Sequence, residues 1–404
     1  RPPGAAAFAA ALAKLDLTAP AAPAAPAPAA RPALGDAELP TEPVLRRPQL
    51  PAMPAPVAPK PPPPQPPLQS GARLGRYEVV GSLAQGGMAE LFVVRAKDTP
   101  WPLVLKTIHP ARARDPEVVS LFMNEARLVS QIDHPNVVRI TDVGFDRQSP
   151  FIAMEYFPSR TLAEVMQALA REQRPMPIEL ATFIVGEAAA GLEAAHTLRD
   201  ADGKPLHLVH RDVTAKNLLI GYAGGVKVAD FGIARTAGMA RFTTPGHVRG
   251  TAAWVSPEQI QGGAVTPATD VWALGVNLYL MLAGALPFKG KTDVELLMQV
   301  TQSEPMGVRR TRPEVPAELA EVLPRALAKS PVERYPSAAD LREDVRQFAP
   351  DARAGQHALA ALIDALFPRE TDEERQRVAR LAPEEAMPEG ASSPLKRLMG
   401  WLRK

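Results

Sequence analysis

The 404-residue sequence has no cysteine, few aromatic residues and a net charge of only +2. Without cysteine, the chain can build neither a disulfide framework nor a zinc-thiolate site, and this absence fits a reducing compartment. The small net charge gives no reason to expect a nucleic-acid partner. Because the first residue is Arg1 rather than Met, we expect the true N-terminus to lie upstream.

Long apolar stretches are also scarce. The longest, VWALGVNLYLMLAGALPF (271–288), is interrupted by Asn277 and two glycines and is at the lower length limit for crossing a bilayer. We therefore predict a buried core helix here rather than a membrane span. The segment AFAAALAKL near the start lacks the layout of an export signal, so the expected location is cytoplasmic.

Proline and alanine are abundant and are concentrated in the first 70 residues, which include KPPPPQPP at 60–67. Such a segment cannot bury enough apolar surface to offset the entropy of ordering it. We predict that residues 1–72 form a disordered tether with polyproline II character. A plain spacer is the simpler interpretation, and docking of a proline-recognising partner is the alternative.

After residue 72 the pattern becomes that of a folded domain. RYEVVGSL, AELFVVRA and PLVLKTI are rich in Val, Leu and aromatics and broken by Gly and Pro, which predicts strands. PEVVSLFMNEARLVSQI (116–132) has the spacing of a helix with one apolar face. We expect a sheet-rich half (73–157), a helical half (158–349) and a helical extension (350–404) that contains HALAALIDALF and DEERQRVARL.

Five polar residues have types and an order that suit phosphoryl transfer from ATP, which needs a cation for the phosphates, metal ligands and a group that orients the attacking hydroxyl. Lys106 ends an apolar strand, and Glu125 on the predicted helix would pair with it and hold the ammonium against the phosphates. Asp212 and Asn217 lie in HRDVTAKN, and Asp230 lies in VADFGIAR. A carboxylate and an amide oxygen that converge on one point suit Mg²⁺.

These stretches, together with LAQGGMAELF, GTAAWVSPEQ, DVWALG and RYPSAADL, resemble the bacterial eukaryotic-like (Hanks-type) serine/threonine protein kinases. The resemblance covers residues 76 to about 349. It implies an α+β bilobal protein kinase fold, with a mostly antiparallel five-stranded N-lobe and a helical C-lobe. ATP with Mg²⁺, or with Mn²⁺ in its place, would bind between the lobes, and protein Ser or Thr hydroxyls would accept the phosphoryl group.

The resemblance also implies residue roles. Asp212 would orient the substrate hydroxyl, and Asn217 and Asp230 would bind the metals. Thr251 would line the substrate-serine pocket, and Asp270 would brace the catalytic loop. A buried ion pair is expected between Glu258 and Arg334. Further nucleotide-binding candidates, from the phosphate-covering loop, the strands, the gatekeeper and the hinge, are Leu83, Ala84, Gly86, Gly87, Leu91, Val104, Met154, Glu155, Phe157 and Leu219.

Two stretches depart from the family pattern. In AQGGMA, Ala84 and Ala89 replace the outer glycines of G-x-G-x-x-G, so nucleotide affinity is expected to fall without being lost. Thr214 stands where the family commonly has a lysine that contacts the γ-phosphate, and Lys216 lies two positions later. Because the strand lysine and both catalytic aspartates are retained, we expect an active kinase. The alternative is a nucleotide-binding pseudokinase scaffold that regulates partner proteins.

Two further segments suggest control. Arg211 precedes the catalytic Asp, and in kinases with that arrangement the arginine pairs with a phosphate on the activation loop, for which Thr243 and Thr244 are the candidates. Our hypothesis is autophosphorylation in trans through self-association; the alternative is two ordinary turn threonines. The ending SPLKRLMGWLRK would form a short basic amphipathic helix, weakened by Gly400. We expect it to pack on the kinase or fray, with peripheral membrane contact as the alternative.

Overall fold

The computed structural model describes residues 69–85, 89–109, 112–113, 115–146, 149–200, 202–232 and 252–381. Several predictions lie outside these residues. They concern the tether up to residue 68, the loop glycines Gly86 and Gly87, the threonines Thr243, Thr244 and Thr251, and the basic C-terminal helix.

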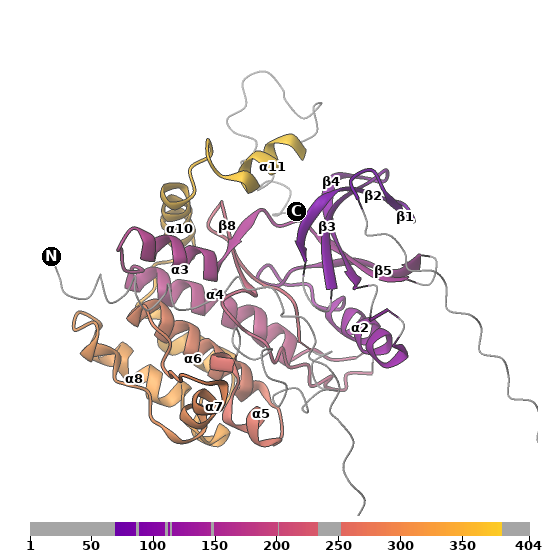
Figure 1. The fold of residues 1–404 in the computed structure, drawn as a ribbon. Helices are drawn as coiled ribbons and strands as arrows, with labels where there is room; N and C mark the ends of the chain where they lie inside the picture. Colours follow the sequence, from indigo (N-terminus) through magenta and orange to yellow (C-terminus); the bar gives the residue numbers. More distant parts are fainter. Residues whose placement is uncertain are drawn as a thin grey trace, which may run out of the picture. The chain divides into compact units, whose positions relative to one another are not determined.

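The sheet-rich part is a six-stranded antiparallel sheet with the order β1-β2-β3-β4-β6-β5 (Figure 1). Its strands are β1 Arg73–Leu74, β2 Tyr77–Gln85, β3 Ala89–Ala96, β4 Thr99–Ile108, β5 Ile140–Asp146 and β6 Ser149–Glu155. The predicted strands of the N-lobe are present, and the two-residue β1 adds one edge strand to the five that were expected.

Apolar side chains from neighbouring strands form the core of this sheet. Tyr77, Phe92 and Leu105 are almost completely buried in one cluster, and the ring of Phe151 meets that of Tyr77 edge to face with centroids 5.5 Å apart. Edge-to-face packing of this kind is the arrangement that aromatic quadrupoles favour. The cluster makes the sheet a rigid support for the residues that β4 carries.

Helix α2, Pro116–Val129, packs against the sheet through Phe122 and Met123 and is the helix predicted from the apolar spacing. It begins after Asp115, whose carboxylate accepts the backbone N–H groups of Glu117 and Val118. Such an N-cap satisfies amide donors that the helix itself cannot. The same helix places Glu125 on its buried side, facing β4.

The helical part is built on α4 and α6, which contact each other. In α6 every residue from Ala268 to Ala283 is buried, and the amide of Asn277 donates to the backbone oxygens of Val213 and Ala273. This confirms the prediction of a core helix. No helix of the described part of the chain is long and apolar enough to cross a membrane. The helices are α3 Leu162–Arg171, α4 Ile178–His196, α5 Pro257–Gln261, α6 Pro267–Ala283, α7 Asp293–Gln302, α8 Ala317–Ala326 and α9 Ala338–Arg346, with 3-10 turns η2 Ala252–Trp254, η3 Val308–Arg310 and η4 Pro331–Glu333.

A second, three-stranded sheet has the order β7-β8-β9 and joins antiparallel β7 Ser159–Thr161, β8 Leu218–Gly221 and β9 Val226–Val228. The stretch HRDVTAKN ends directly before β8, and Asp230 follows β9 by two residues. Because the start of β8 is paired with the end of β9, both segments lie at the same end of this sheet. The chain continues into α10 Ala352–Leu366 and α11 Glu373–Leu381, which confirms the two helices predicted after residue 350.

Candidate active site

Lys106 is at the centre of the candidate site. It lies in β4, opposite Leu91 of β3 and Ile152 of β6. Its Nζ is 3.4 Å from Oε1 of Glu125 and 3.2 Å from Oδ1 of Asp230. Burial works to lower the pKa of Lys106, but the carboxylates of Asp230 and Glu125 outweigh it and raise that pKa above its usual value. The ammonium is therefore charged at neutral pH, and the predicted Lys106–Glu125 pair is confirmed.

Asp212 and Asn217 lie side by side in the catalytic loop. Nδ2 of Asn217 donates to the backbone oxygen of Asp212 at 2.8 Å and to its Oδ2 at 3.1 Å. The backbone N–H of Ala229 donates to the backbone oxygen of Asn217 at 2.9 Å, which brings the following residue, Asp230, to the same edge. The structure thus gathers the predicted hydroxyl-orienting and metal-binding residues.

Asp270 holds this loop in place through hydrogen bonds to its backbone. Its carboxylate accepts the backbone N–H groups of His210 and Arg211, each at 2.8 Å, and lies 2.8 Å from Nε2 of His196. Burial alone would raise the pKa of Asp270, but its hydrogen bond with His196, its electrostatic interactions with His196 and His210 and the backbone N–H of His210 lower it below its usual value. The predicted bracing role of Asp270 is confirmed by these bonds.

The backbone of the site is held in conformations that residues with a side chain rarely adopt. Arg211 has a φ of 70° and Asp230 a φ of 56°. Left-handed backbone of this kind persists where surrounding bonds fix it, and it is concentrated at functional sites. Here the bond from Arg211 to Asp270 fixes the first residue, and the ring of Phe231, packed 4.4 Å from that of His210, adjoins the second.

Four predicted residues line one pocket: Lys106, Glu125, Met154 and Asp230. The remaining walls are mostly apolar and are formed by Val129, Val138, Ile140, Ile152, Val228, Ala229 and Phe231. The pocket thus combines mostly apolar walls with a few charged groups, which is the kind of lining that ligand sites in proteins usually have.

The other nucleotide-binding candidates lie in the strands and the hinge beside this pocket. Val104 is opposite Met154 in the β4–β6 ladder, and Ala84 is opposite Leu91 in the β2–β3 ladder. Leu83, Leu91 and Leu219 are half-buried, while Glu155 is buried and Phe157 half-buried in the hinge after β6. These residues are not among those that line the described pocket, so their contact with a purine stays a prediction.

One ion pair beside the site was missed by the sequence analysis. Nζ of Lys227 in β9 donates to Oε1 of Glu155 at 2.6 Å and to the backbone oxygen of Val137 at 3.2 Å. Glu155 also accepts the backbone N–H of Arg139 at 2.9 Å. The pair joins the hinge to β9. In the sequence, a lysine in VKV reads as an ordinary strand residue, and its partner is 72 positions away.

The two departures from the family pattern have different surroundings. Thr214 is buried, and its backbone oxygen accepts the N–H of Asn217 at 3.0 Å, so it shapes the turn of the loop. Lys216 is exposed. The predicted ion pair of Glu258 and Arg334 is confirmed, with Oε2 and Nη2 2.8 Å apart.

The donor set fits Mg²⁺. Asp230 offers a carboxylate that is 40% exposed, and Asn217 brings an amide to the same edge. Within the described residues, no group of three or more His, Cys, Asp or Glu side chains could hold a metal alone. Mg²⁺ does not require such a group, because it keeps several waters and is bound through one or two protein ligands together with substrate phosphates.

Comparison with known proteins places this geometry in a family. Residues 77–351 match the model of the protein kinase domain. The chain is 35% identical over 324 residues to the tyrosine-protein kinase MasK of Myxococcus xanthus, covering 79% of this chain and 50% of that protein. It is 32% identical over 272 residues to the serine/threonine-protein kinase PrkC of Bacillus subtilis, covering 67% and 40%. The chain thus spans half or less of the length of these relatives.

A solved structure agrees with the sequence matches. The kinase domain of Mycobacterium tuberculosis PknI superimposes with a TM-score of 0.54 at 26% identity, over 70% of this chain and 99% of that domain. The sheet and the helical part therefore have relatives both in sequence and in fold. The chain belongs to the bacterial Hanks-type protein kinases.

Proposed function

We propose that the protein is a serine/threonine kinase that transfers the γ-phosphoryl group of ATP to Ser or Thr hydroxyls of proteins, itself included. The Lys106 ammonium, held between Glu125 and Asp230 in one pocket, is the observation that carries the proposal. Asp212 and Asn217 adjoin it in the hydrogen-bonded catalytic loop. These are the parts that phosphoryl transfer requires.

Each side chain has one task in this proposal. Lys106 holds the α- and β-phosphates, and Glu125 keeps the ammonium in place. Asp212 accepts the proton of the substrate hydroxyl, whose oxygen bonds to the γ-phosphorus while the bond to the β-phosphate oxygen breaks. Asn217 and Asp230 would hold Mg²⁺, or Mn²⁺, which neutralises charge on the phosphates when bound. Most of the rate enhancement then comes from positioning and charge.

Arg211 offers a place where phosphorylation would act. Its Nε is buried without a hydrogen-bond partner among the described residues, and burial lowers its pKa from the usual value. A phosphate on Thr243 or Thr244 would offer the Arg211 side chain an acceptor through charge-assisted bonds.

The identity of the phosphorylated residue is the first test. HRDVTAKN and GTAAWVSPE resemble the Ser/Thr branch, whereas MasK is named a tyrosine kinase. The purified full chain would be incubated with radiolabelled ATP, Mg²⁺ and a generic basic protein, and the phospho-amino acids separated. We expect label on Ser and Thr, with Thr243 or Thr244 among the mapped sites of self-labelling. Label confined to Tyr would replace the proposal, and no label, with ATP still raising the melting temperature, would favour the scaffold.

A further inference from the structure

The two helices that follow the kinase domain pack against it. The family model ends at residue 351, and α10 and α11 lie beyond it. Yet Leu359 and Ile363 of α10 are fully buried in the same core as the C-lobe. We call α10, the turn 367–372 and α11 the C-terminal clasp.

Two glycines show how closely α10 lies on the kinase domain. A Cβ atom on Gly355 would come 2.5 Å from the ring of Phe183, and one on Gly224 would come 1.8 Å from the backbone oxygen of Gln356. Both distances are far below van der Waals contact, so the two surfaces fit only because side chains are absent there. This contact fixes the start of the clasp against α4 and against the turn between β8 and β9.

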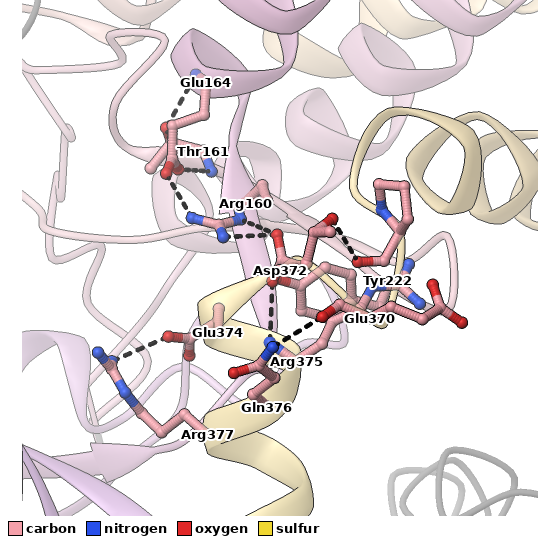
Figure 2. A network of polar contacts seen from close by, with 12 residues as sticks. Arg160, Thr161, Glu164, Tyr222, Glu370, Asp372, Glu374, Arg375, Gln376 and Arg377 are labelled. Atoms are coloured by element: carbon pink, nitrogen blue, oxygen red, sulfur yellow. Dashed lines mark hydrogen bonds and ion pairs between the residues drawn. The ribbon is translucent and has the colours of Figure 1, made fainter.

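Asp372 anchors the turn between the two helices of the clasp. Its Oδ2 accepts Nε and Nη2 of Arg160 at 3.1 and 2.6 Å, and its Oδ1 accepts the Tyr222 hydroxyl and the Arg375 backbone N–H, each at 2.8 Å (Figure 2). Burial works to raise the pKa of Asp372, but these donors outweigh it and lower that pKa. The carboxylate stays charged and joins α11 to β7 and to the end of β8, directly after the hinge.

The hinge itself is held from both sides. Glu155 binds Lys227, and the ring of Phe157 lies so close to Gly221 that a Cβ there would come within 2.6 Å of it. Tyr156, between them, donates its hydroxyl to Oε1 of Glu374 in α11. Burial and the Glu374 carboxylate raise the pKa of Tyr156, so this hydroxyl remains a donor at neutral pH. The clasp therefore holds the side chain in the middle of the segment whose backbone is predicted to bind adenine.

A hinge that is held in place before ATP binds should raise the affinity for ATP. A hinge that is already ordered loses little conformational entropy when the adenine binds, whereas a loosened hinge must be ordered at that moment. Phosphoryl transfer itself depends on Lys106, Asp212 and the metal ligands, whereas the clasp bonds described above run to Arg160, Tyr222 and Tyr156. The expected effect of the clasp is therefore on nucleotide binding and not on the chemical step.

We propose that the C-terminal clasp sets the affinity for ATP, with Glu374 as the positioning residue that acts through Tyr156 on the hinge. The inference rests on the proposed function for its ligand, ATP. It assigns to residues beyond the kinase domain a part in the nucleotide site.

The test uses the full chain with Tyr156→Phe, Glu374→Ala and both changes together, and Glu374→Gln as the conservative variant. Steady-state transfer would give KM for ATP and kcat, and titration with ADP and Mg²⁺ would give Kd without any need for activity. We expect each single change to raise KM and Kd about three- to tenfold with kcat within about twofold. The double change should add little to Glu374→Ala, because both single changes remove the Tyr156–Glu374 bond and only Glu374→Ala also removes the Glu374–Arg377 ion pair. Glu374→Gln, which keeps an acceptor oxygen, should restore most of the affinity.

Glu343→Ala is the matched control, because Glu343 forms an exposed ion pair with Arg346 on α9. Its KM and Kd should equal those of the wild type. Amide exchange of residues 155–157 should quicken in Glu374→Ala and not in Glu343→Ala. A Glu374→Ala protein with a lower melting temperature but unchanged Kd would mean that the clasp is only structural, and fully additive single changes would equally overturn the proposal. If the protein transfers no phosphate, the Kd and exchange measurements still decide the inference separately from the proposed function.

Discussion

At the scale of single residues, Thr214 stands where the family resemblance leads us to expect a lysine that contacts the γ-phosphate. Thr214 is buried and shapes the catalytic loop, so it brings no cation to the cleft. Lys216 is exposed, directly before Asn217. In the transition state charge spreads over the γ-phosphoryl oxygens, and a nearby cation stabilises it. We infer that Lys216 supplies part of the charge that Thr214 lacks.

Lys216→Met tests this inference. We expect kcat to fall about tenfold, less than for a fully desolvated donor because Lys216 is exposed, and KM for ATP to change little. Lys289→Met, which removes an exposed lysine after α6, is the matched control and should keep the wild-type kcat. Equal kcat values for the two variants would show that Lys216 takes no part.

Residues with an ordered motif could be predicted from the sequence, and residues without one could not. The Lys106–Glu125 pair was predicted from residue types and their order, the Glu258–Arg334 pair from the family resemblance, and both are present. Lys227 has no such signal, because a bond between distant strands leaves no periodic trace in the sequence. The purine contacts of the predicted nucleotide-binding residues stay predictions.

At the scale of helices and strands, the Glu258–Arg334 pair ties α5 to the segment between η4 and α9. Both carboxylate oxygens accept the Arg334 guanidinium, at 2.9 and 2.8 Å, and the Thr269 hydroxyl donates to Oε1. The Arg334 side chain is completely buried. Burial alone would raise the pKa of Glu258, but Arg334 lowers it below the usual 4.5. Removal of one partner would leave an uncompensated buried charge.

Glu258→Ala should therefore destabilise the protein by about 3–5 kcal/mol at pH 7, measured as the midpoint of urea unfolding. Because the folded-state pKa is depressed, the stabilisation is complete above pH 4.5 and is lost as the pH falls below that value toward the folded-state pKa. Between those limits the wild type should lose stability faster than Glu258→Gln. Parallel pH profiles of the two proteins would contradict this account of the pair.

Helices and strands with a strong apolar periodicity were predicted well, but the residues at which they end were predicted less well. Helix α2 ends at Val129, although the apolar spacing continues to residue 132, because the backbone N–H groups of Gln131 and Ile132 donate to oxygens three residues back instead of four. The edge strand β1 has two residues and no alternation to detect. The helices α10 and α11 were expected, but their docking depends on glycines and carboxylates whose partners lie far away in sequence.

At the scale of the whole molecule, the site is assembled from segments that share buried contacts. Val129 of α2 packs with Ala195 of α4 and with Phe231 in one cluster, so the helix that carries Glu125 rests on the C-lobe. The backbone N–H of Val138 donates to Val228 of β9 at 3.0 Å. These contacts and the Lys227–Glu155 pair hold the N-lobe residues of the site next to its C-lobe residues. The resemblance predicted this bilobal arrangement correctly, while the segment of Thr243 and Thr244 lies outside the described residues.

The central claim is that the gathered residues carry out phosphoryl transfer and do not merely bind nucleotide. The most direct measurement compares wild type with Asp212→Asn for the rate of transfer at saturating ATP and Mg²⁺, and for the affinity of ATP in the same preparations. Asparagine has the same shape and still offers an oxygen to Nδ2 of Asn217, so the loop should keep its structure. We predict that transfer falls by about a thousandfold while ATP affinity stays within about threefold. A variant that transfers phosphate at the wild-type rate would contradict the account.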